Sequence, residues 1–153
     1  MSLEEKARQL AQRKTTQKEV DWPAERDWWL KQLRALHEQV RQWLAPLVGQ
    51  GLVEIETRPV RLNEENIGAY AAEALILNFS GEAVVLDPQG TLIVGARGRV
   101  DVYRRGYRGA QPVMLILGGE RDAPVWTIWA TRDPATRRPL DEASLRELVD
   151  SLL

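Results

Sequence analysis

The amino-acid sequence predicts an α+β fold: N-terminal helices, an antiparallel meander of six to seven strands or a partly closed barrel, and a C-terminal helix packed on the sheet. Three observations support this prediction. Apolar residues recur at helical spacing before Gly49, the period changes to two after Gly51, and the helical period returns after Leu140. The segments between the expected strands are too short for helical crossovers, so we expect antiparallel pairing.

The length and composition indicate one globular unit. A chain of 153 residues is long enough to bury a substantial core. We expect residues 1–20 to form a polar helical arm and residues 21–153 to form a single α+β domain. The formal net charge of -1 predicts no strong overall attraction to nucleic acid or membranes. There is no long apolar run and no signal-peptide pattern, so we expect no membrane span and a cytoplasmic protein.

The first expected helix ends near residue 19. Ser2 and Glu5 have the spacing of a capping box, in which each side chain bonds a backbone N–H at the start of a helix. The apolar stripe of this helix is thin, and residues 6–18 carry basic side chains without an acid between them. We interpret the segment as a solvated terminus, with a basic arm for an anionic partner as the alternative.

The second expected helix is the clearest element of the sequence. Asp21 is a good N-cap, and Pro23 is tolerated in a first helical turn. A heptad-spaced apolar seam follows, which Leu30 and Leu44 widen; its members are Trp29, Leu33, Leu36, Val40, Trp43 and Leu47. We expect this seam to pack on the protein's own sheet.

Two tryptophans of the same helix lie off the seam. Trp22 and Trp28 are candidate interface residues, because aromatic side chains concentrate where proteins contact one another. They favour a homodimer or a protein partner.

Apolar and polar residues alternate over 52–62, which predicts the first strand. The further strands are expected at 73–79, 82–87, 91–94, 99–104, 113–117 and 125–131. Pro59 indicates an edge strand or a break, and 63–72 is read as a connector. The Asp-Pro-Gln-Gly sequence at 87–90 predicts a turn. The strands at 113–117 and 125–131 are apolar on both faces, so we expect cover on both sides.

The closing helix is expected to begin after Asp141. Asp141 is a suitable N-cap, and the apolar face of the helix consists of Leu145, Leu148, Val149 and Leu152. A basic, proline-containing loop at 131–139 precedes it.

No motif in the sequence predicts a named chemistry. Cysteine is absent, which excludes disulfides and thiolate catalysis, and His37 is the single histidine. Phosphate-loop motifs and regularly spaced metal-binding acids are absent as well. We therefore predict no catalytic residue, cofactor or metal site, although a pair of carboxylates for acid–base catalysis stays open.

The most distinctive polar segment is 97–108, which contains five arginines against one aspartate. A strand period of two separates Val100 and Val102 from the opposite face. The candidate binding face consists of Arg97, Arg99, Asp101, Tyr103, Arg105 and Tyr107. Arginine and tyrosine suit binding surfaces, but a solvated strand face has the same pattern.

Three functional hypotheses follow from these patterns. The first is a non-catalytic binding or interaction protein that associates with itself or with another protein. The second is an anion-binding module, for nucleic acid or acidic lipid, that uses the arginine–tyrosine strand. The third is a small enzyme with a carboxylate-based site.

Overall fold

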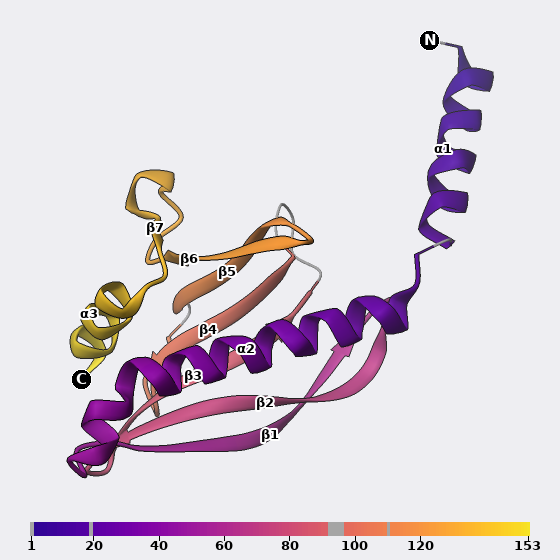
Figure 1. Cartoon of the computed structure of the whole chain (residues 1–153). Coiled ribbons are helices and arrows are strands. Elements are labelled where there is room, and N and C mark those ends of the chain that lie inside the picture. Colours follow the sequence, from indigo (N-terminus) through magenta and orange to yellow (C-terminus); the bar gives the residue numbers. More distant parts are fainter. Residues whose placement is uncertain (1, 19, 92–96, 110) are drawn as a thin grey trace.

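The computed structural model describes residues 2–18, 20–91, 97–109 and 111–153 (Figure 1). Helices α1 (Leu3–Lys18) and α2 (Trp22–Gly49) come first, and helix α3 (Glu142–Leu152) comes last. Between them lie β1 (Glu54–Glu64), β2 (Gly68–Phe79), β3 (Glu82–Gly90), β4 (Gly98–Arg104), β5 (Val113–Glu120), β6 (Ala123–Trp129) and β7 (Arg138–Pro139). The predicted α+β class is confirmed, with an open sheet rather than a closed barrel.

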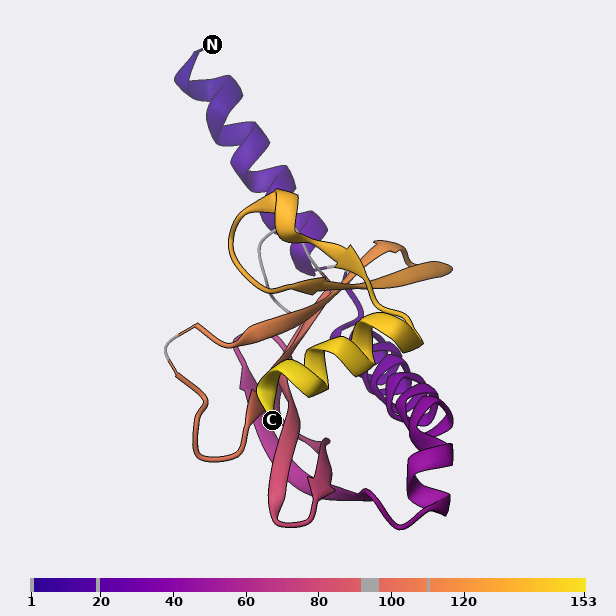
Figure 2. The same cartoon turned by 90° about the vertical axis from the view of Figure 1, so that its left-hand side faces the viewer.

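The seven strands form one antiparallel sheet whose spatial order is the chain order, β1 to β7. Pro59 lies on the edge strand β1, as its missing N–H predicts. Helix α1 extends away from the sheet in both views (Figures 1 and 2), and the side chains at 2–12 are exposed. The Ser2 hydroxyl accepts a hydrogen bond from the Glu5 N–H, which is one half of the predicted capping box.

Helix α2 lies across one face of the sheet and supplies the centre of the core (Figure 1). Its most buried apolar residues are Trp29, Leu33, Leu36, Val40 and Leu44. This spacing follows the α-helical period of 3.6 rather than a strict heptad, because a single straight helix on a sheet does not supercoil. Leu44 is consequently buried, whereas Trp43 and Leu47 of the predicted seam lie at its margin.

Helix α3 closes the same core. Asp141 accepts a hydrogen bond from the Ser144 N–H at 2.8 Å, while the Ser144 hydroxyl accepts one from the Asp141 N–H, so the predicted cap is confirmed. Leu145, Leu148 and Val149 are buried against α2 and the sheet. Arg146 also donates a hydrogen bond to the Trp43 carbonyl of α2.

Two loops predicted from the sequence are wrong. The connector expected at 63–72 is a tight turn, because β1 continues to Glu64 and β2 already begins at Gly68, where φ is +86°. The turn expected at 87–90 is instead the end of β3, with a register shift between Pro88 and Gly90. A β-bulge tolerates proline and a positive-φ glycine as a turn does. Of the strand expected at 91–94, residues 92–94 lie outside the described residues.

Neither α2 nor α3 covers the second face of the sheet, which we call the outer face. Buried residues on it, including Ile76 and Ile116, lie apart from the helix-covered core. Among the described residues, none of the helices combines the length and the apolar character that crossing a membrane requires.

Candidate anion-binding pocket

The candidate binding residues on strand β4 lie on the face opposite to the core. Val100 and Val102 are fully buried beneath α2, so the alternation of the strand directs Arg99, Asp101 and Tyr103 to the outer face. Residues 99, 101 and 103 therefore share one side of the strand.

The alternation ends with the strand at Arg104. A turn follows, in which Gly106 has a φ of +86°, and residues 105–109 no longer continue the row of β4. Tyr107 is 70% exposed, and its ring lies 5.0 Å from the guanidinium of Arg104. Arg105 is exposed as well, so the outer-face row that the structure describes on β4 comprises residues 99, 101 and 103.

Asp101 is a fully buried carboxylate at the centre of this row. It accepts hydrogen bonds from Arg99 at 2.6 Å (Nε) and 3.1 Å (Nη2), and from Arg108 Nη2 at 2.6 Å. Two guanidinium groups thus neutralise the buried charge, as desolvation requires. Asp101 therefore holds the arginines in place from beneath and is not itself a contact surface.

A second carboxylate lies directly opposite. Asp87 of β3 is the cross-strand partner of Asp101, and the Tyr103 hydroxyl donates a hydrogen bond to it at 2.9 Å. Burial, and then this hydrogen bond, raise the pKa of Tyr103 to about 12. Asp87 was predicted to start a turn, whereas in the structure it is part of the polar network of the outer face.

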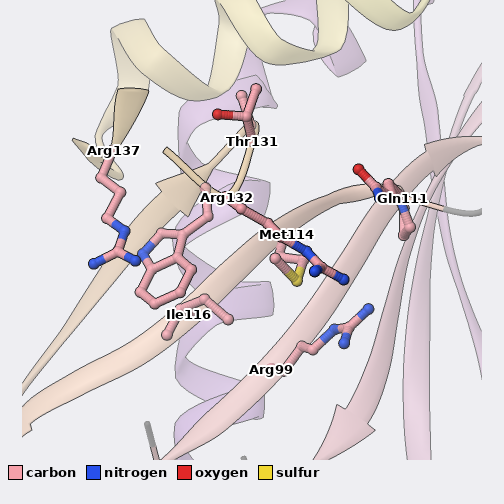
Figure 3. Close-up of a pocket in the computed structure, with 10 residues that line it drawn as sticks. Arg99, Gln111, Met114, Ile116, Thr131, Arg132 and Arg137 are labelled. Carbon is pink, nitrogen blue, oxygen red and sulfur yellow. The ribbon is translucent and has the colours of Figure 1, made fainter. Parts of the chain in front are cut away.

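A pocket of about 430 Å³ lies beside this network, over strands β4 to β6 (Figure 3). Its floor consists of Met114, Ile116 and Trp129. These side chains make β5 and β6 apolar on both faces, for which the sequence predicted cover on both sides. No helix covers the strands at this pocket, and its remaining lining comes from loops. The loop residues are Gln111, Pro112, Ala130, Thr131, Arg132 and Arg137.

Three arginines from three separate segments line this pocket: Arg99 on β4, Arg132 after β6, and Arg137 after the 3₁₀ turn Pro134–Thr136 (Figure 3). The Arg137 guanidinium stacks on Trp129, 3.5 Å from the ring centroid. Neither Arg132 nor Arg137 has a carboxylate partner within the described ranges, and no acidic residue is among those that line the pocket. The result is a cationic pocket with an apolar floor.

The other candidate residues lie elsewhere. Arg97 lies 6.0 Å from the ring of Trp28, and Arg121 lies 5.6 Å from the same ring. Arg97 and Trp28, which the sequence assigned to two different surfaces, therefore contact each other within the chain. Trp28 and Trp22 are both half-buried.

Sequence reasoning missed Arg132, Arg137 and Trp129. The available signal was the basic, proline-containing loop at 131–139, directly after a strand that ends in an aromatic residue. That this loop folds back over β5 is a tertiary property, which the local pattern does not contain.

In the part of the chain that the structure describes, no group of three side chains drawn from histidine, aspartate and glutamate lies close enough together to hold a metal ion. His37 lies away from the pocket, on α2, and is 6% exposed. Burial, and then the nearby charge of Arg41, lower the pKa of His37 to about 4. Compared with known proteins, the chain matches no family model, no curated protein and no solved structure.

Proposed function

We propose that this protein is a binding protein that recognises an anionic group in the pocket over β4 to β6. The observation that carries the proposal is that Arg99, Arg132 and Arg137 line one pocket whose lining contains no carboxylate. An anion that enters this pocket is attracted by the positive charges that line it. Arg99 is already oriented by Asp101, which lowers the entropy cost of binding.

The shape and floor of the pocket favour a compact organic anion. Met114, Ile116 and Trp129 offer an apolar surface, while guanidinium forks match carboxylate and phosphate oxygens. A pocket bounded by loops suits one anionic group better than the extended backbone of a nucleic acid or a lipid surface. The expected ligand is therefore a carboxylate or phosphate monoester with an apolar body.

Calorimetric titration with phenyl phosphate and benzoate tests the proposal. Both anions are expected to bind more tightly than the neutral benzyl alcohol, and binding should weaken as salt is added. Arg132→Glu should weaken phenyl phosphate at least about tenfold, since it replaces a charge-assisted contact with a repulsion.

Arg61→Glu is the matched control for this experiment. Arg61 is exposed on β1, and the substitution makes the same change in net charge outside the pocket. Equal weakening by both variants would mean that net charge, not the pocket, attracts the anion. Failure of both anions to bind at millimolar concentration would overturn the proposal.

Self-association through Trp22 or Trp28 is a second proposal, carried by the half-burial of these two rings. Arg97 and Arg121 contact the Trp28 ring, and the part of the ring that stays exposed is available to a partner. Light scattering after size exclusion should give the mass of a dimer, and Trp22→Ala should return a monomer. A monomeric wild-type protein at high concentration would contradict this prediction.

A further inference from the structure

The arginines of the anion pocket lie on two opposite sides of it. Arg99 belongs to β4, whereas the Arg137 guanidinium lies on the ring of Trp129, which belongs to β6. Strand β5 lies between these two sides, because it pairs with β4 along one edge and with β6 along the other. Neighbouring strands are about 4.8 Å apart, so roughly 10 Å of sheet separates Arg99 from Trp129.

Arg132 joins the side of the pocket on which Arg99 lies. Its backbone follows β6, but its side chain extends over Met114 toward Arg99, and Arg137 lies on the opposite side (Figure 3). The floor between the two sides consists of Met114 and Ile116 of β5, whose side chains offer no hydrogen-bond donor. The pocket therefore has two cationic ends and an apolar middle.

A separate contact orients the guanidinium group at each end. Arg99 donates to Asp101 through Nε and Nη2, which leaves Nη1 to donate to a ligand. At the other end, Trp129 covers one face of the Arg137 guanidinium. The N–H groups of a guanidinium lie in its own plane, so this stacking leaves them accessible. A planar fork of N–H donors matches the two oxygens of a carboxylate.

A ligand with a single anionic group occupies only one of the two ends. A second anionic group at the far end of the same molecule would gain further charge-assisted hydrogen bonds. Given the anion-binding function proposed for this pocket, on which this inference rests, we propose that the ligand is an elongated dicarboxylate. One carboxylate lies at Arg99 and Arg132, the other lies at Arg137, and the apolar body covers Met114 and Ile116.

Three benzoic acids are the matched probes for calorimetric titration. Terephthalate has carboxylates at opposite ends of its ring, and 4-methylbenzoate replaces one of them with a methyl group. Phthalate has the charge of terephthalate, but its carboxylates are on neighbouring carbons and cannot reach both ends of the pocket. Terephthalate is expected to bind at least about tenfold more tightly than 4-methylbenzoate, the contribution of one charge-assisted hydrogen bond. It should also bind more tightly than phthalate.

Arg137→Met is the variant that removes one end of the pocket. Methionine keeps an apolar side chain beside Trp129 and removes the fork of donors, so the affinity ratio of terephthalate to 4-methylbenzoate should fall from about ten to near one. Arg61→Met is the matched control, because Arg61 is exposed on β1 and lies outside the lining. This control should keep the wild-type ratio.

The outcomes separate this inference from the anion-binding function beneath it. If terephthalate binds no more tightly than 4-methylbenzoate or phthalate, or if its advantage survives Arg137→Met, the dicarboxylate assignment is overturned and the anion site stands. If none of the three acids binds at millimolar concentration, both proposals fall.

Discussion

Replacing Asp101 with asparagine is expected to lower the free energy of unfolding by about 3 kcal/mol, the lower end of the cost of breaking a buried ion pair. The Asp101 carboxylate is fully buried and accepts three hydrogen bonds from Arg99 and Arg108. Asparagine removes the charge and directs an amide donor at guanidinium donors. The arginine side chains are 30% and 46% exposed, so they can partly recover solvation, which keeps the loss from being larger.

Urea unfolding measures this loss, and Glu82→Gln is its control. Glu82 pairs with Arg104, but its side chain is 55% exposed, so breaking that pair should cost less than about 1 kcal/mol. The triple variant Arg99→Met, Asp101→Leu, Arg108→Met should recover most of the stability, because apolar residues need no compensation. It should nevertheless lose affinity for phenyl phosphate. If Asp101→Asn unfolds at the same urea concentration as the wild type, the buried ion pair is not a stabilising centre.

Replacing Gly98 with alanine is expected to destabilise the fold by about 3 kcal/mol or more, at the upper end of the cost of overpacking. A Cβ atom at Gly98 would lie 2.1 Å from Cζ3 of Trp29 and within 2.8 Å of two further ring atoms. The Trp29 ring is fully buried and packs against the ring of Trp126, with centroids 6.1 Å apart. The Trp29 ring is buried and β4 is paired on both edges, so neither can shift without disturbing other contacts.

Gly118→Ala is the matched substitution for Gly98→Ala. Gly118 also lies in a strand, but a Cβ atom there would meet nothing within 4 Å, so stability should change little. Thermal unfolding compares the two variants. Adding Trp29→Leu to Gly98→Ala should restore part of the loss, because the smaller side chain leaves room for the methyl group. Equal melting temperatures for Gly98→Ala and Gly118→Ala would show that contact with Trp29 does not constrain β4.

Local periodicity accounts for what the sequence predicted correctly. The stripe from Trp29 to Leu44 and the opposition of Val100 and Asp101 depend on residue spacing alone. The turn expected at 87–90 failed because a bulge has the same local preferences. Gly90 has a φ of +136°, and a Cβ atom there would also lie 2.9 Å from the Glu64 carboxyl carbon, a contact between residues distant in sequence.

The candidate site was predicted only in part, for a related reason. Strand alternation placed Arg99, Asp101 and Tyr103 on one face, but the prediction carried the same alternation on to Arg105 and Tyr107, beyond the end of β4. The buried Asp101 carboxylate is also bonded by Arg108, which returns to it after the turn at Gly106. Likewise, Arg137 reaches the pocket because the 3₁₀ turn, capped by Asp133, folds the loop toward Trp129. Such contacts join segments that no local pattern relates.

The order of the strands has a consequence for how the chain folds. Each of the seven strands pairs with its neighbours in sequence, so the sheet can assemble as successive hairpins with short loop closures. The contact between α3 and α2 is not local in sequence, because Arg146 and Trp43 lie 103 residues apart. We therefore expect hairpin pairing to precede the docking of α3 on α2. An intermediate in which α3 has not docked would expose part of the apolar core that α3 covers. This intermediate would be the species most prone to aggregation.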